Sequence, residues 1–210
     1  AGSGGVLVPP VGYLERLREI TEAHGILLIF DEVITAFGRL GWGSAAERLG
    51  VVPDIMCTAK GLTSGTVPMG AVVVQEKIRE AFMKGPPAAI EFFHGYTYSG
   101  HPLAAAAAHA ALDVYENEGL FEHVRGLDAS WEAGLHALAN KPHVIDVRNI
   151  GLAGAVELRP RDGAPTQRAM AVFREAFDQG LLVRATADIV ALAPPLVINE
   201  TEIDQMIGIL

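Results

Sequence analysis

Two short apolar runs, each followed by a charged residue, constrain the fold of this chain most strongly. Residues 26–30 (ILLIF) lead to Asp31, and residues 55–59 (IMCTA) lead to Lys60. Apolar runs of this length without alternation are typical of parallel strands that are buried on both faces. Since ligands of such sheets bind beyond the carboxyl ends of the strands, we expect Asp31 and Lys60 at the same edge of one sheet.

A lysine and a carboxylate at one sheet edge would suit Schiff-base chemistry. A lysine that leaves an apolar strand can be partly desolvated, which favours the neutral amine that attacks a carbonyl group. A carboxylate nearby can hold a cation or a protonated ring nitrogen. Charged residues also end strands without any catalytic role, so these two segments alone leave both interpretations open.

Composition narrows the class of partner. Half of the 210 residues are hydrophobic and a fifth are charged, which is typical of a globular chain. The net charge of -9 comes without a Lys/Arg cluster, so we expect no nucleic-acid partner. The longest apolar stretch, residues 103–112, is interrupted by His109 and is too short to span a bilayer, so we expect no membrane partner.

Other familiar signals are missing from the sequence. The seven histidines have no metal-ligand spacing, so no metal site is expected. Neither G-x-x-x-x-G-K-[ST] nor G-x-G-x-x-G after a strand occurs, which disfavours nucleotide binding by those routes. A single cysteine, Cys57, rules out an internal disulfide and fits a reducing compartment, and there is no signal peptide, so we expect a cytoplasmic protein.

The order of expected elements predicts an α/β fold, whose first part covers residues 1–118. After a strand end at 6–8, an amphipathic helix closed by Gly25 precedes the strand at 26–30. The connection to the strand at 55–59 is long enough for a parallel crossover. Only residues 61–68 precede the next apolar run, 70–74, so that run is expected to pair antiparallel. Helices are expected at 75–84 and 102–118.

Residues 119–210 are expected to form a smaller α/β domain, with Gly119 as the boundary. Helices are predicted at 120–140, at 167–179 and from Thr201 onward. Strands are predicted at 144–147 and 155–158 and around Val183 and Val190. Such alternation is typical of helices that pack on a small sheet.

Four motifs follow one another in order: residues 31–39 (DEVITAFGR), 53–62 (PDIMCTAKGL), 67–71 (VPMGA) and 94–102 (HGYTYSGHP). Together with 151–154 (GLAG) and 160–163 (PRDG), they resemble the class III, pyridoxal-phosphate (PLP)-dependent aminotransferases. Within that family the resemblance is to the omega-amino acid:pyruvate (β-alanine:pyruvate) type. It implies PLP as cofactor and the C-terminal half of a fold-type I PLP-dependent transferase, with a mostly parallel sheet that contains one antiparallel strand.

The resemblance also implies roles for five residues. Lys60 would form the Schiff base with the cofactor and act as the catalytic base, and Asp31 would keep the pyridine nitrogen protonated. Val33 would pack against the ring, and Thr97 would contact the phosphate of the neighbouring subunit's cofactor, which implies a homodimer or higher oligomer. Arg184 would bind the substrate carboxylate. Three loop aromatics are possible pocket walls: Trp42, Tyr96 and Tyr98.

The implied activity is transfer of an amino group from an omega-amino acid or amine to a keto acid such as pyruvate. Members of the family are longer, so we expect this chain to lack an N-terminal part that carries a phosphate loop and a ring-stacking aromatic, and to stop within its last helix. Two alternatives stay open: a PLP-dependent mutase, racemase or decarboxylase of the same fold, and an inactive fragment that retains the fold.

Overall fold

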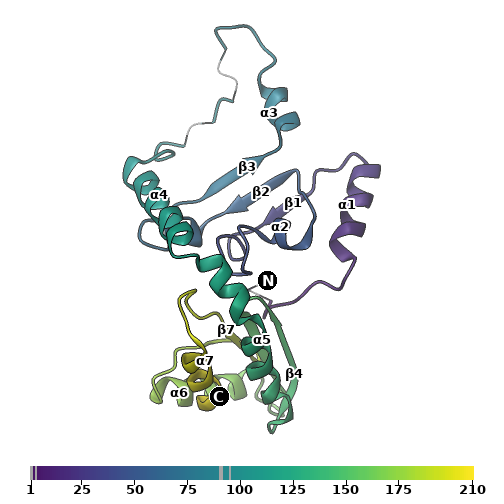
Figure 1. Ribbon diagram of the computed structural model, residues 1–210. Helices are drawn as coiled ribbons and strands as arrows, with labels where there is room; N and C mark the ends of the chain where they lie inside the picture. Colours follow the sequence, from purple (N-terminus) through teal and green to yellow (C-terminus); the bar gives the residue numbers. More distant parts are fainter. Residues whose placement is uncertain (1, 3, 90–91, 95) are drawn as a thin grey trace.

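The computed structural model describes residues 2, 4–89, 92–94 and 96–210, so position 95 of the motif at 94–102 lies outside the described residues. The described chain forms two β-sheets (Figure 1). They are connected by two long helices, α4 (Pro102–Asn117) and α5 (Leu120–Ala137), which follow one another with only a short break. No helix of the described residues is long and apolar enough to cross a membrane.

The first sheet has three strands in the order β1-β2-β3. These are β1 (Ile29–Asp31), β2 (Ile55–Thr58) and β3 (Ala71–Val74). β1 pairs parallel with β2, with Ile29 opposite Ile55, and β2 pairs antiparallel with β3. Both pairings confirm the predictions made from connection lengths, because a short link reverses a strand whereas a parallel neighbour needs a longer crossover.

Besides α4, this first part contains α1 (Tyr13–Ala23), α2 (Ala45–Leu49), the 3-10 helix η1 (Lys60–Thr63) and α3 (Glu76–Phe82). The chain leaves α1 through Gly25, whose φ of 64° suits glycine. α2 lies in the crossover between β1 and β2 and begins at Ser44, whose side chain accepts the N–H of Glu47 (3.0 Å). The helices predicted before Gly25 and at 75–84 therefore form, whereas η1 was not predicted.

The prediction that both apolar runs are buried on two faces is wrong for the first run, and the second run is only half-buried. Residues 26–28 stay outside β1 and Ile29 is 56% exposed, whereas on β2 Ile55, Met56 and Cys57 are half-buried and Thr58 is buried. β-branched residues favour a strand, whereas burial needs a second layer on each face, and within the described chain these side chains lack one. The strand end expected at 6–8 is also wrong, since no strand is assigned there and Val6 has a φ of 57°.

The second sheet has four antiparallel strands in the order β4-β5-β7-β6. They are β4 (Val144–Ile150), β5 (Ala153–Leu158), β6 (Arg184–Thr186) and β7 (Ile189–Leu192). The helices of this part are α5, the short 3-10 helix η2 (Leu138–Asn140), α6 (Gln167–Asp178) and α7 (Glu200–Ile209). The elements predicted for residues 119–210 are thus present, within a few residues of their expected bounds.

The core of this second part lies between the sheet and its helices. Trp131 and Leu135 of α5 are fully buried, as is Ile203 of α7 at 1% exposure. Gly154 of β5 allows the close approach of α5, because a Cβ atom there would lie 2.4 Å from Cδ1 of Leu135. The hydrophobic core is therefore built across strands and helices of the smaller sheet.

Several segments connect the two sheets. Gly119, with a φ of 60°, separates α4 from α5. Arg39, in the crossover between β1 and β2, donates from Nη1 to the carbonyl oxygens of Leu152 (3.0 Å) and Pro194 (2.6 Å). Burial lowers the pKa of Arg39. The two carbonyl oxygens accept hydrogen bonds from its guanidinium group at the junction of the two sheets.

The first residues of the chain contact the second sheet. Val6 is 4% exposed and packs with Ala153 and Ala155 of β5. The carbonyl of Gly5 accepts from Nε of Arg148 on β4 (2.8 Å). The division at Gly119 stays a prediction, and this contact shows that the two sequence halves interleave in space.

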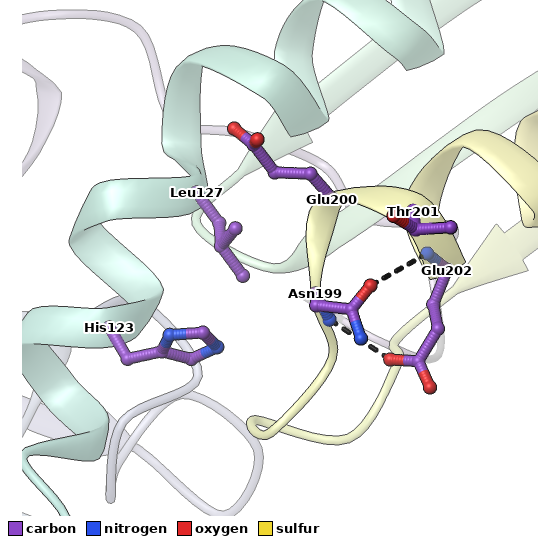
Figure 2. A pocket seen from close by; sticks show the side chains of 6 residues that line it. All are labelled: His123, Leu127, Asn199, Glu200, Thr201 and Glu202. Carbon is purple, nitrogen blue, oxygen red and sulfur yellow. Dashed lines mark hydrogen bonds between the residues drawn. The ribbon is translucent and has the colours of Figure 1, made fainter.

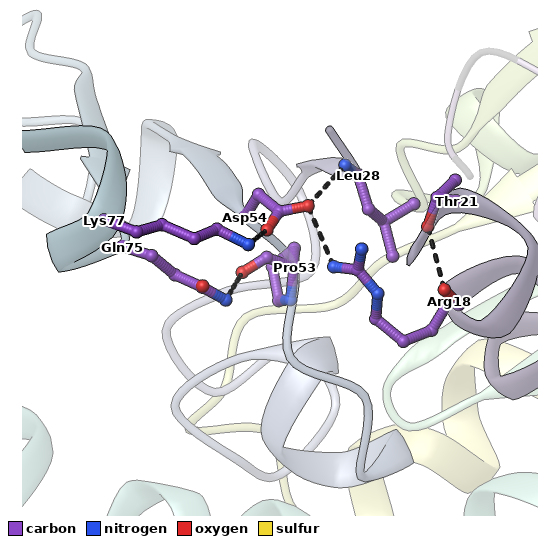
Figure 3. Close-up of polar contacts among 7 residues, drawn as sticks. All are labelled: Arg18, Thr21, Leu28, Pro53, Asp54, Gln75 and Lys77. Carbon is purple, nitrogen blue, oxygen red and sulfur yellow. Dashed lines mark hydrogen bonds and ion pairs between the residues drawn. The ribbon is translucent and has the colours of Figure 1, made fainter. Parts of the chain in front are cut away.

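A buried carboxylate joins the elements of the first sheet at the end away from Lys60. Asp54, which precedes β2, is 1% exposed and accepts from the Leu28 N–H (2.7 Å) and from Nη1 of Arg18 (2.9 Å) (Figure 3). Its other oxygen pairs with Nζ of Lys77 on α3. The Lys77 contact, the Leu28 N–H and Arg18 together hold the pKa of Asp54 well below its usual range, against the opposite effect of burial.

Replacing Asp54 by asparagine should lower the free energy of unfolding by about 1–3 kcal/mol near neutral pH, because two cations lose their charged partner. We expect a smaller loss than for a fully buried ion pair because the Lys77 side chain is largely exposed to water. Urea unfolding followed by circular dichroism measures the difference. Asp162→Asn, at an exposed loop position, is the matched control.

The same variant tests the pH dependence. Because the folded-state pKa of Asp54 is depressed, this stabilisation is complete above the unfolded-state value of about 3.9 and is lost as pH falls through it toward the folded-state pKa. The parent should therefore lose stability more steeply than Asp54→Asn below about pH 4. Equal slopes in parent and variant would show that Asp54 does not contribute as described.

Candidate functional site

The parallel pairing of β1 with β2 brings Asp31 and Lys60 to one edge of the first sheet. Asp31 ends β1 opposite Cys57, and the N–H of Glu32 donates to the Cys57 carbonyl (2.8 Å). β2 ends at Thr58, and the chain reaches Lys60 after one further residue. Since both strands run in the same direction, Asp31 and Lys60 follow adjacent carboxyl ends, where α/β sheets bind ligands.

Asp31 presents an exposed carboxylate whose backbone is held by its neighbours. Oδ1 accepts the N–H of Val33 (3.1 Å), two residues along the chain. Glu32 is 1% exposed and its carboxylate accepts the N–H groups of Ala45 (2.9 Å) and Ala46 (2.8 Å) at the start of α2. Glu32 thereby connects the segment after Asp31 to the crossover helix α2. Val33, the next residue in the chain, is half-buried.

Lys60 has an exposed side chain on a tightly turned backbone. Its φ of 45° lies in the left-handed region, which is unusual for a non-glycine residue, and it begins η1. Among the described residues no ion pair involves its amine. The amine is therefore available to an incoming carbonyl group.

Thr97 lies in the segment that links α3 to α4, which we call the arm (residues 83–101, of which 90, 91 and 95 are not described). The described residues of the arm lie away from both sheets (Figure 1). Thr97 is exposed and belongs to a turn over residues 97–100. Its hydroxyl is therefore accessible from outside the chain.

Arg184 begins β6, the edge strand of the second sheet. It is exposed, and Nε donates to the hydroxyl of Thr186 on the same strand (3.2 Å). This contact leaves the rest of the guanidinium free to bind a carboxylate with two parallel hydrogen bonds.

The three loop aromatics have different surroundings. The guanidinium of Arg125 on α5 lies 4.8 Å above the Trp42 ring, and its Nη1 donates to the Gly41 carbonyl (2.5 Å). Trp42 thus packs against α5, which fixes the segment after Asp31. Tyr96 and Tyr98 on the arm are 67% and 77% exposed.

Two hollows of the described chain lie away from Asp31 and Lys60. The larger, about 570 Å³ and wide open, lies between α5 and α7, and Figure 2 shows its lining: His123, Leu127, Asn199, Glu200, Thr201 and Glu202. The side chains of Asn199 and Glu202 each accept a hydrogen bond from the backbone N–H of the other residue (both 3.0 Å), so these polar groups cap α7. The smaller, about 300 Å³, is lined by residues 10–13, 16, 17 and 20. Neither hollow is lined by Asp31 or Lys60.

The family is decided by comparison with known proteins. The family model described as aminotransferase class-III matches residues 1–210. The chain belongs to the class-III aminotransferases. This confirms the family resemblance of the four motifs.

Two relatives of this class-III chain are enzymes of the type predicted. One is an omega-aminotransferase of Caulobacter vibrioides, 58% identical over 207 residues, which cover 99% of this chain and 47% of the relative. The other is a beta-alanine–pyruvate aminotransferase of Pseudomonas aeruginosa, 51% identical over 208 residues, which cover 98% of this chain and 46% of the relative. The class-III chain therefore spans about half the length of these relatives.

Solved structures confirm the fold. An amine transaminase from an uncultivated Pseudomonas species, in its PLP-bound form, matches with a TM-score of 0.91 at 40% identity, over 99% of this chain and 48% of that one. An (S)-enantioselective omega-transaminase from Thermomicrobium roseum matches with a TM-score of 0.91 at 38% identity, over 99% and 47%. The α/β fold predicted for this class-III chain is thus that of part of a transaminase.

The predicted site residues of the class-III chain fall into two groups. Asp31, Val33 and Lys60 share one edge of the first sheet, whereas Thr97 lies on the arm and Arg184 on the second sheet. In the described part of the chain, no hydrogen bond or ion pair links Thr97 or Arg184 to the first group. No group of three or more metal-binding side chains occurs among the described residues either.

Sequence reasoning gave Glu32 no role, although its contacts organise the site. A buried carboxylate that accepts helix N–H groups reads in sequence as one more acid beside Asp31. The only signal in the sequence was the position of Glu32, an acid at the end of an apolar strand and 13 residues before the start of a short helix, where a negative charge is favourable. The contact itself depends on how the crossover folds.

Proposed function

We propose that this chain carries the lysine and the carboxylate of a PLP-dependent aminotransferase. It would transfer an amino group from an omega-amino acid or amine to a keto acid such as pyruvate. The observation that carries the proposal is the parallel pairing of β1 with β2, which brings Asp31 and Lys60 to one sheet edge in a class-III chain. The names of the two relatives support the substrate class.

The residues at this edge fit the cofactor chemically. PLP, when bound, supplies an aldehyde and an electron-withdrawing pyridine ring that stabilises a carbanion. Oδ1 of Asp31 accepts the Val33 N–H, and Oδ2 has no hydrogen bond to the described residues, so it can accept one from a protonated ring nitrogen. Lys60 offers an exposed amine for the aldehyde carbon.

Each residue then has a defined task. Nζ of Lys60 would hold the cofactor covalently and, once a substrate amine has displaced it, would move a proton between the substrate carbon and the cofactor. Oδ2 of Asp31 would keep the ring nitrogen protonated by its negative charge. Val33 would pack its apolar side chain against the ring.

Arg184 is proposed to bind the substrate carboxylate. Arg184→Ala should lower kcat/KM for β-alanine and pyruvate by about tenfold to a few hundredfold, because two charge-assisted hydrogen bonds are lost. An amine donor without a carboxylate should change far less in its half-reaction. In protein of the relatives' length, each donor is measured as a single half-reaction on the PLP-bound form through the cofactor's absorbance, and alanine formation measures the reaction with pyruvate. Arg174→Ala, at an exposed position on α6, is the control.

The outcomes separate the alternatives. Equal losses for carboxylate and non-carboxylate donors would mean that Arg184 supports the fold or the cofactor. A PLP-dependent mutase, racemase or decarboxylase would form no alanine from pyruvate with any donor. A fragment without catalytic function would keep no absorbance of a lysine-bound cofactor, which lies near the visible range, after unbound PLP is removed by gel filtration.

Thr97 is proposed to contact the phosphate of a second subunit's cofactor. The arm that carries it exposes large aromatic side chains: Phe92 at 60%, Phe93 at 87%, Tyr96 at 67% and Tyr98 at 77%. Apolar surface of this extent favours a protein interface. A homodimer or larger oligomer would cover it and bring Thr97 to the other subunit's site.

Sedimentation in protein of the relatives' length should therefore show at least a dimer. Thr97→Val should weaken cofactor retention with little change in the sedimentation coefficient, because it removes one hydroxyl and keeps the shape. A fully active monomer would contradict the proposal.

With a single cysteine, Cys57, the protein is proposed to be cytoplasmic, which cell fractionation tests.

A further inference from the structure

The turn that carries Lys60 depends on support from outside its own segment. Lys60 has a φ of 45°, a conformation that residues with a Cβ atom disfavour. Two amides close the turn from within: the N–H of Ser64 donates to the Gly61 carbonyl (3.2 Å), and the N–H of Gly65 donates to the Lys60 carbonyl (3.2 Å). A strained position of this kind persists only where neighbouring elements over-determine it.

Tyr115 supplies a contact from a distant helix. It lies on α4, is 7% exposed, and its hydroxyl donates to the Gly61 carbonyl (2.7 Å), 54 residues earlier in the chain. The Gly61 carbonyl therefore accepts two hydrogen bonds, from Ser64 and from Tyr115. The second one connects the residue after Lys60 to the body of α4.

The Tyr115 ring is itself held in place by packing. It belongs to a buried cluster with Ala111 and Leu120, against which Phe37 and Phe121 pack, and the Tyr115 and Phe121 ring centroids are 5.7 Å apart. Phe37 also contacts the turn, since a Cβ atom on Gly61 would lie 2.8 Å from Cβ of Phe37. Because Phe37 follows Asp31 by six residues, one aromatic cluster supports both motifs of the sheet edge.

We propose that Tyr115 is a positioning residue for Lys60: its hydroxyl holds the Lys60–Gly61 turn in the conformation from which the lysine amine reacts. The inference rests on the proposed function for Lys60. Tyr115 is buried beneath the turn and acts through the backbone, so it takes no proton from the substrate. Loss of the hydroxyl should loosen the turn while the ring keeps the cluster filled.

Hydrogen exchange on this chain tests the hold on the turn without any cofactor. In Tyr115→Phe, the amides of Ser64 and Gly65 should exchange about five- to tenfold faster than in the parent, relative to amides of β5 in the other sheet. Tyr13→Phe, which removes an exposed hydroxyl on α1, should leave them unchanged. Unchanged exchange in Tyr115→Phe, or an equal rise in β5, would overturn the inference.

A second measurement separates positioning from a purely structural role. PLP added to each variant is trapped with borohydride, and peptide mapping compares labelling of Lys60 with that of the exposed Lys141 in the same chain. In Tyr115→Phe, Lys60 should be labelled several-fold more slowly than in the parent, while the labelling of Lys141 stays unchanged. In protein of the relatives' length, the same variant should have a lower kcat and a nearly constant KM. Loosened exchange with parental Lys60 labelling and kcat would overturn the positioning role. Absence of Lys60 label in the parent would instead refute the proposed function, and the exchange data would then decide whether Tyr115 holds the turn.

Discussion

Turnover is expected to fall by roughly a thousandfold or more when Lys60 is replaced by alanine in protein of the relatives' length. Lys60 is proposed to serve twice, as the covalent attachment point and as the base at the substrate carbon, so alanine removes both contributions. The substitution leaves the hydrogen bonds around Gly61 in place, because they use backbone groups and the Tyr115 hydroxyl.

The measurement is a single half-reaction with β-alanine, followed through the cofactor's absorbance. Lys141→Ala, at an exposed position between η2 and β4, is the matched control and should keep parental activity. A Lys60→Ala variant that retains activity near the parental level would assign the amine chemistry to another residue.

Asp31→Asn is expected to lower turnover by about a hundredfold to a thousandfold. An amide has nearly the same shape and can still accept the Val33 N–H, so the segment after β1 should keep its conformation. It carries no charge, however, and cannot keep a pyridine nitrogen protonated, which weakens the ring's withdrawal of electrons.

Circular dichroism should show a parental fold for this variant, and its cofactor content separates lost binding from lost chemistry. Asp162→Asn supplies the matched control at an exposed acid of the second part. Near-parental turnover with the cofactor retained would make Asp31 a structural residue.

Local sequence patterns predicted most of the elements because the forces that form them are local. Gly25 ends α1 through its left-handed φ, and Pro102 opens α4 where its missing N–H costs nothing. The antiparallel β3 followed from the length of one connection alone. These predictions needed no knowledge of distant contacts.

The predictions that are wrong or incomplete concern contacts between distant segments. Burial of Ile29 depends on a second layer, which its own strand cannot reveal. Likewise, the contact of Val6 with β5 and that of Tyr115 with Gly61 span long stretches of sequence. A tyrosine within an alanine-rich helix carries no pattern that names its partner.

The candidate site shows the same division. Asp31 and Lys60 were identified because each follows an apolar run and lies in a motif, and the parallel register then brings them to one edge. Thr97 and Arg184 came from the family resemblance alone, and their place on the arm and on an edge strand leaves their roles as proposals.

The most direct test of this account is to locate the residue that binds the cofactor. Protein of the relatives' length is loaded with PLP, reduced with borohydride, digested and mapped by mass spectrometry. The account predicts a pyridoxyl group on Lys60, in the peptide that contains Ala59 and Gly61, and its loss in Lys60→Ala. A pyridoxyl group on any other lysine, with Lys60 unmodified, would contradict the central claim.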